Sequence, residues 1–132
     1  MKKILFIEDE SALQKTFGDL LAQEGYEMIS ALDGELGLRL AKEKNPDLIL
    51  LDLILPKMHG LQVLEELKKE EKTKEIPVIV LTNLEEMENI NKAIQAGADT
   101  YLVKANYKLE EVLEKIKIAL RANLKSQIPN SK

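Results

Sequence analysis

Short apolar runs rich in β-formers alternate with longer helical patterns five times along the 132-residue chain. The runs that we predict as strands cover residues 3–8, 26–31, 47–52, 76–82 and 100–104. Two of them are continuously apolar, around residues 48–51 and 78–81, which is typical of parallel strands covered by helices on both faces. Strand–helix alternation of this kind predicts βαβ units with right-handed crossovers. We therefore expect an α/β fold on a five-stranded parallel sheet.

Apolar residues at helical spacing occupy the segments between these strands. Leu13, Phe17 and Leu21 form one such stripe, and residues 109–120 contain the clearest one. Gly25 and Gly97 stand where helix C-caps are expected.

Two further signals predict the ends of helices. Asn45-Pro46 is expected to stop the second helix, and Asn83 with Glu86 resembles a capping box that opens the fourth. We assign residues 1–122 to one domain and residues 123–132 to a polar C-terminal tail or the start of a linker.

Composition excludes several classes of function. A net charge of −4 gives no overall attraction for nucleic acid or anionic membranes, and the absence of cysteine excludes disulfides and thiolate metal sites. The apolar run at residues 4–7 stops at Glu8-Asp9, too soon for a signal peptide. We therefore expect a soluble, cytoplasmic protein without a membrane span.

Polar side chains stand at the carboxyl ends of four of the five predicted strands. These side chains are Glu8, Asp9, Asp52, Thr82 and Lys104. Ligands of open α/β sheets bind beyond the carboxyl ends of the strands, so these groups are expected to share one crevice. Three carboxylates there would repel one another, and Mg²⁺ with a phosphoryl group would relieve that repulsion. The sequence thus predicts a site for magnesium and a phosphoryl group.

Asp52 is the best candidate for a nucleophile in this crevice. A carboxylate is already ionised at neutral pH and needs no general base. Lys104 would place a positive charge on a phosphoryl oxygen, and Thr82 would donate its hydroxyl.

This set of residues resembles the response regulator receiver family of two-component signalling, the CheY-like domains, from Lys3 to about Ala122. The segments that carry the resemblance are Glu8-Asp9, Leu50 to Pro56, Met58, Gly60, Thr82 and Gly97 to Lys104. The resemblance implies a flavodoxin-like, doubly wound sheet of order 2-1-3-4-5 with five helices.

The resemblance also implies a role for each matching residue. Asp52 would be the phosphoacceptor. Asp9 would bind Mg²⁺ directly, Glu8 through water, and Ile54 through its main-chain carbonyl. Thr82 would be the switch hydroxyl and Tyr101 the aromatic switch.

A phosphorylation-dependent signalling switch follows from that resemblance. Asp52 would take a phosphoryl group from a sensor histidine kinase or a phosphotransfer protein. The surface of the fourth helix, fifth strand and fifth helix would then change for a downstream protein target. Such a domain is expected to be a monomer or a weak phosphorylation-dependent dimer, to contact no nucleic acid directly, and to be no enzyme beyond its own phosphotransfer and slow autodephosphorylation.

Several residues depart from the family pattern. Ala105 replaces the proline that usually follows the lysine, so no cis bond is assumed at that position. His59 is taken as a surface turn residue. Asn83 is larger than the usual alanine or glycine. Ile54 and Leu84 are apolar where some relatives orient water, which predicts a long-lived acyl phosphate.

Three alternatives compete with this interpretation. A haloacid dehalogenase-type phosphohydrolase needs a second acid two residues after the nucleophile, where this chain has Ile54. A flavin carrier needs a phosphate loop after the first strand, where Glu8-Asp9-Glu10 would repel a phosphate. A degenerate receiver that binds partners without being phosphorylated stays open, although Asp52, Thr82 and Lys104 argue against it.

Overall fold

The computed structural model describes the main chain of residues 1–126 and the side chains of residues 1–122. Five parallel strands form one sheet of order β2-β1-β3-β4-β5. The strands are β1 (Lys3–Ile7), β2 (Glu27–Ala31), β3 (Leu48–Leu51), β4 (Val78–Thr82) and β5 (Thr100–Val103). The helices are α1 (Ser11–Gln23), α2 (Gly34–Lys44), α3 (Gly60–Lys69), α4 (Met87–Gln95) and α5 (Leu109–Ser126), with a 3₁₀ turn at Lys104–Asn106. The predicted fold class and strand order are confirmed.

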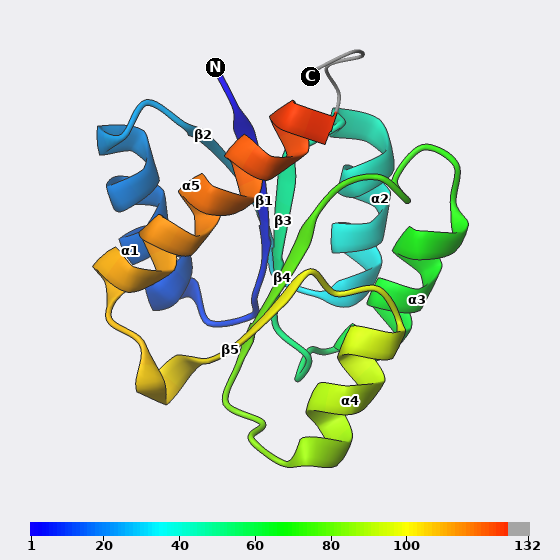
Figure 1. Ribbon diagram of the computed structural model, residues 1–132. Helices are drawn as coiled ribbons and strands as arrows, with labels where there is room; N and C mark the ends of the chain where they lie inside the picture. Colours follow the sequence, from blue (N-terminus) through cyan, green and yellow to red (C-terminus); the bar gives the residue numbers. More distant parts are fainter. Residues whose placement is uncertain (127–132) are drawn as a thin grey trace.

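Helices cover both faces of the sheet, as the apolar strands predicted (Figure 1). On one face, Phe17 of α1 and Ile116 of α5 pack against Phe6 and Leu50 of the sheet. On the other face, α2, α3 and α4 pack against the alternate strand residues, among them Leu51. Successive strand side chains point to opposite faces, so a strand buried on both sides must be apolar throughout.

The predicted ends of three helices are confirmed. Asn45 follows α2 with a left-handed backbone (φ 49°), and Gly25 and Gly97 follow α1 and α4 at φ 86° and 113°. Positive φ costs glycine no steric penalty, which is why it stands at these two turns.

The predicted capping box at Asn83 is wrong. Helix α4 begins at Met87, and its N-cap residue is Glu86, whose carboxylate accepts from the Asn89 side chain and from no main-chain N–H of the cap. Residues 84–86 continue without helical structure because half-buried Leu84 packs on the core and its carbonyl accepts a hydrogen bond from Tyr101. Tertiary contacts therefore delay the start of the helix.

The described part of α5 reaches Ser126, four residues beyond residue 122, the predicted end of the domain. Residues 127–132 lie outside the described residues, so the predicted domain boundary stays a prediction. No helix in the described part of the chain combines the length and the apolar character that a membrane span requires.

Candidate functional site

The carboxyl ends of β1, β3, β4 and β5 place the predicted site residues at one end of the sheet. Glu8 and Asp9 directly follow β1, Asp52 directly follows β3, Thr82 is the last residue of β4, and Lys104 directly follows β5. The β1–β3 ladder extends to Asp52, whose N–H donates to the Ile7 carbonyl at 3.0 Å.

The loop after Asp52 folds back closely over it. The N–H of Gly60 donates to the Leu53 carbonyl at 2.9 Å. A Cβ atom at Gly60 would lie 2.3 Å from the Asp52 carbonyl oxygen, so only glycine fits there. This close approach explains physically why the loop needs glycine at its end.

Three carboxylates converge at this end of the sheet. Glu8, Asp9 and Asp52 each offer an oxygen, and these oxygens lie within 4.8 Å of one another. Glu8 and Asp52 are 1% and 5% exposed, whereas Asp9 is exposed to solvent. Oxygen ligands of this kind, with one side open to water, suit Mg²⁺, which keeps several waters when it binds to proteins. Within the described residues, this is the one such group of three potential ligands.

Lys104 provides the positive charge between the acids. Its Nζ lies 2.6 Å from Oε1 of Glu8 and 3.0 Å from Oδ2 of Asp52. The sequence predicted Lys104 beside Asp52 but not its shorter contact with Glu8. The contact joins residues 96 positions apart, and the order of residues in the sequence carries no signal for it.

The electrostatics of the site follow from this burial. Burial raises the pKa of Glu8 above its ordinary value of 4.5, although hydrogen bonds from Lys104 and the Glu10 main chain oppose it. Burial also acts to lower the pKa of Lys104, but the hydrogen bonds to Glu8 and Asp52 outweigh it and hold that pKa above 10.5. The site therefore keeps Lys104 charged, while burial disfavours the charged form of Glu8.

Thr82 is fully buried, and its hydroxyl has no hydrogen-bond partner. Buried hydroxyls are normally paired, so an unpaired one at a strand end points to a ligand acceptor. This hydroxyl and the Lys104 ammonium are donors of the kind that bind phosphoryl oxygens, and the three acids offer oxygen ligands for a metal ion.

Tyr101 and Ile54 flank the site. The Tyr101 hydroxyl donates to the Leu84 carbonyl at 2.8 Å, and burial raises its pKa above 10.0, with a further contribution from the Asp52 charge. The Ile54 N–H donates to Oδ1 of Asp52 at 3.2 Å, while its side chain is 54% exposed.

His59 and Asn83 do not belong to this group of converging side chains. His59 is the N-cap of α3, and its Nδ1 accepts from the Leu61 N–H at 3.2 Å, in agreement with a turn residue. Asn83 is exposed. The described residues contain no cis peptide bond, so the Lys104–Ala105 bond is trans.

Gln14 is a buried polar residue that the sequence did not single out. It lies on α1, is 5% exposed, and its Nε2 approaches three main-chain carbonyls at the end of β1 and β2. A signal was present, because Gln14, Phe17 and Leu21 share one buried face of α1. A polar residue within such an apolar stripe is expected to be buried and to have a hydrogen-bond partner.

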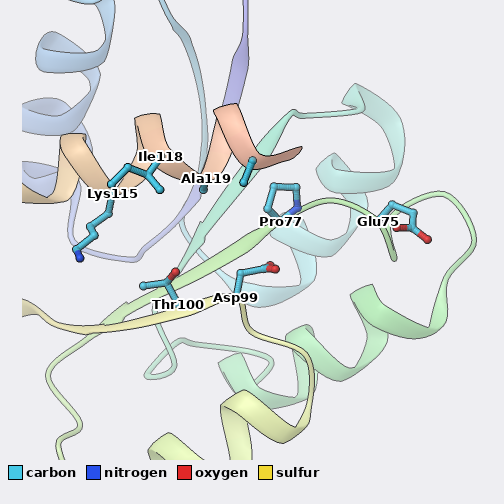
Figure 2. A pocket seen from close by; sticks show the side chains of 8 residues that line it. Glu75, Pro77, Asp99, Thr100, Lys115, Ile118 and Ala119 are labelled. Carbon is cyan, nitrogen blue, oxygen red and sulfur yellow. The ribbon is translucent and has the colours of Figure 1, made fainter. Parts of the chain in front are cut away.

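A hollow of about 520 Å³ lies at the opposite end of the sheet, between α5 and the starts of β4 and β5 (Figure 2). Its lining includes Asp99, Lys115 and Ile118. Oδ2 of Asp99 already accepts from the Val78 N–H at 2.7 Å, so this acid serves the main chain of the sheet.

Comparison with known proteins places these residues in a family. The family model that describes response regulator receiver domains matches residues 4–117 of this chain. The DNA-binding dual master transcriptional regulator RpaA of Synechocystis is 39% identical over 92% of this chain and 50% of its own length. The chain thus spans about half the length of this curated relative.

Solved structures agree with that match. A CheY-like receiver domain protein from Methanospirillum hungatei has a TM-score of 0.89 and 32% identity, over 96% of this chain and 98% of its own. The receiver domain of the sensor histidine kinase PA1611 from Pseudomonas aeruginosa, with magnesium coordinated in its active site cleft, has a TM-score of 0.82 and 28% identity, over 91% and 98%. The chain therefore belongs to the response regulator receiver domains of two-component signalling.

Proposed function

We propose that Asp52 accepts a phosphoryl group in a Mg²⁺-dependent reaction and that the phosphorylated chain acts as a signalling switch. The observation that carries the proposal is the convergence of three carboxylates, with Lys104 Nζ 3.0 Å from Oδ2 of Asp52. This is the arrangement that a nucleophilic carboxylate needs beside charge-stabilising groups.

Asp9 and Asp52 would hold the ion through their carboxylates, Glu8 through water, and Ile54 through its carbonyl. The ion, when bound, neutralises charge on the transferring phosphoryl group. One Asp52 oxygen attacks phosphorus in line on the far side from the leaving nitrogen of a phosphohistidine. A P–O bond forms as the P–N bond breaks, and the histidine nitrogen leaves with the electron pair. The product is an acyl phosphate on Asp52.

The remaining residues respond to the new charge. A phosphoryl group adds nearly a full further negative charge and three acceptor oxygens. Lys104 would transfer its hydrogen bond from Asp52 to a phosphoryl oxygen, and the unpaired Thr82 hydroxyl would donate to another. Tyr101 would give up its bond to the Leu84 carbonyl and turn inward. The surface of α4, β5 and α5 would change with it.

The partners follow from this mechanism. The phosphoryl donor would be a sensor histidine kinase or a phosphotransfer protein, and the receiver would report to a downstream protein surface. The name of RpaA includes DNA binding for that protein, which is about twice as long as this chain. We propose that the receiver itself contacts no nucleic acid, because its net charge is −4.

The apolar side chains of Ile54 and Leu84 support a long phosphoryl lifetime. Neither offers a polar atom that would orient a water for attack on the acyl phosphate, so autodephosphorylation would be slow.

The test is phosphorylation by a small phosphodonor, with and without Mg²⁺, in wild type and Asp52→Asn. The proposal expects labelling of wild type with Mg²⁺ only, and none of Asp52→Asn. Labelling that ignores Mg²⁺ would contradict the metal site. A wild type that is never labelled, with either phosphodonor or kinase, would favour the degenerate receiver that binds partners independently of phosphorylation.

A further inference from the structure

Gln14 connects helix α1 to the turn that carries the acidic pair. Its Nε2 lies 2.9 Å from the Phe6 carbonyl, 2.9 Å from the Glu8 carbonyl and 3.1 Å from the Ala31 carbonyl. These contacts join the first helix to the ends of β1 and β2.

The chemistry of the three partners determines which way the amide points. A side-chain amide has two N–H donors on its nitrogen and an oxygen that only accepts. The opposite orientation would set this oxygen against three carbonyl oxygens. In the observed orientation Oε1 is buried and has no partner. A methionine would fill the same space without an unpaired oxygen, so the distinctive contribution of Gln14 is its pair of donors.

One of the three carbonyls belongs to the site. The Glu8 carbonyl lies in the peptide unit that joins Glu8 to Asp9, so a hydrogen bond to it restrains the two predicted ligands together. The Ala31 carbonyl accepts from Gln14 and also from the Glu8 N–H at 2.9 Å. The edge strand β2 thereby anchors the preceding peptide, which joins Ile7 to Glu8, and the two peptides that flank Glu8 are both restrained.

The turn needs such an anchor because its charges repel. Oxygens of Glu8, Asp9 and Asp52 lie within 4.8 Å of one another, and Lys104 approaches only Glu8 and Asp52 among them. Without a bound cation, the exposed Asp9 carboxylate gains by turning away from the other two acids. A main-chain restraint on the Glu8–Asp9 peptide limits that movement and keeps the ligands in place.

We propose that Gln14 is a positioning residue for the divalent cation site. Its amide holds the Glu8–Asp9 peptide so that both carboxylates face Asp52 before the cation arrives. The inference rests on the proposed Mg²⁺ site and adds to it a residue that touches neither the ion nor the phosphoryl group.

The test compares Mg²⁺ binding by wild type and Gln14→Met, measured by isothermal titration calorimetry on unphosphorylated protein. Groups that orient metal ligands typically change metal affinity 10–100-fold when they are removed. We expect Gln14→Met to bind Mg²⁺ about 10-fold more weakly. In phosphodonor assays the Mg²⁺ concentration for half-maximal labelling should rise by a similar factor, while the rate at saturating Mg²⁺ stays close to that of wild type.

Thr73→Val provides the matched control. Thr73 is fully buried beyond α3, at the opposite end of the sheet, and its hydroxyl also donates to a main-chain carbonyl, that of Leu67, at 2.7 Å. This variant loses a comparable buried donor and should keep the wild-type Mg²⁺ affinity. Should Gln14→Met fail to fold, Gln14→Asn replaces it, because the shorter amide cannot reach all three carbonyls and should weaken Mg²⁺ binding several-fold.

Equal Mg²⁺ affinity in wild type and the Gln14 variant would overturn the inference and leave the metal site intact. A loss in Thr73→Val as large as that in the Gln14 variant would also overturn it, since general destabilisation would then explain both. Absence of Mg²⁺ binding in the wild type itself would remove the proposed metal site and this inference with it.

Discussion

The polar side chains at the two ends of the sheet differ in their hydrogen-bond partners. At the amino end, three polar side chains each have a main-chain partner: exposed Asp99, half-buried Lys68 and buried Thr73. Asp99 accepts from Val78 at 2.7 Å, Thr73 donates to Leu67 at 2.7 Å, and the Lys68 ammonium donates to the Ile76 carbonyl at 2.9 Å. These bonds close the loops and the starts of the strands.

At the carboxyl end, the polar groups face one another instead. Three carboxylates lie close together beside a single lysine, and the buried Thr82 hydroxyl has no partner. Both buried side-chain atoms that lack a partner in the described residues, on Thr82 and Gln14, belong to this end. Satisfied polar groups stabilise a fold, whereas repelling acids and an unpaired buried hydroxyl cost stability, and this difference marks the carboxyl end as the candidate ligand site.

The largest expected effect is the loss of phosphorylation in Asp52→Asn, compared with Asp99→Ala at the amino end of the sheet. Asp52→Asn should abolish phosphodonor labelling because it removes the nucleophile. Asp99→Ala should keep labelling but lower the free energy of unfolding by about 1–3 kcal/mol, because the buried Val78 N–H loses its acceptor. Intact-mass spectrometry and urea unfolding measure the two effects. Residual labelling of Asp52→Asn at another acid would contradict the prediction that Asp52 is the phosphoacceptor.

The lysines at the two ends should respond differently to Mg²⁺. Lys104→Met leaves Glu8 and Asp52 without their counter-charge and should cost about 2 kcal/mol of stability, less than the ~3–5 kcal/mol typical of a fully buried pair. Added Mg²⁺ should recover much of this loss. Lys68→Met should cost about 1–2 kcal/mol, and Mg²⁺ should not restore it. Thermal unfolding of both variants with and without Mg²⁺ measures the two effects. Equal stabilisation of Lys104→Met and Lys68→Met by Mg²⁺ would contradict the prediction.

The pH dependence of stability should also differ between these lysines. Burial lowers the pKa of Lys68 below 10.5, so its charging penalty is relieved as the pH rises through that lowered pKa. Bonds to Glu8 and Asp52 hold the pKa of Lys104 above 10.5 despite burial, so its stabilising contribution is full below 10.5 and is lost as the pH rises further. Urea unfolding of wild type and both methionine variants between about pH 8 and 11 tests this. The prediction would be contradicted if Lys68→Met and Lys104→Met changed the pH dependence of the free energy of unfolding in the same direction.

The smallest effect concerns the lifetime of the acyl phosphate. Ile54→Asn places a polar group beside Asp52 that can orient water, so dephosphorylation should accelerate several-fold, well below the ~100-fold of a full general base. Ile118→Asn, at an exposed position of α5 that lines the hollow at the opposite end of the sheet, serves as a control that should leave the lifetime unchanged. Decay of the wild-type phosphoryl group within seconds would count against slow autodephosphorylation.

Much of this arrangement could be predicted from the sequence because it depends on local pattern. Continuous apolar runs fixed which segments become buried parallel strands, and the residue after each run, such as Asp52 or Lys104, had to emerge at one end of the sheet. Glycine and asparagine marked helix ends for the same local reason. Convergence followed from topology alone.

The remainder depends on tertiary contacts that no local pattern contains. Asn83 carries a capping signal, but Leu84 packs on the core and the helix starts later at Met87. Lys104 lies closer to Glu8 than to Asp52, and these residues are 96 and 52 positions away from it in the sequence. The spacing of Gln14 with Phe17 and Leu21 indicates a buried position on α1, but its three carbonyl partners cannot be read from that spacing.

The most direct test of the central claim is a crystal structure of the protein with Mg²⁺ and beryllofluoride, a stable mimic of the phosphoryl group. The account predicts beryllium bonded to an Asp52 oxygen, Mg²⁺ held by Asp9 and Asp52, and fluorides contacted by Lys104 Nζ and Thr82 Oγ1. Beryllofluoride at another residue, or Lys104 still bridging Glu8 and Asp52 with the Thr82 hydroxyl unpaired, would contradict it.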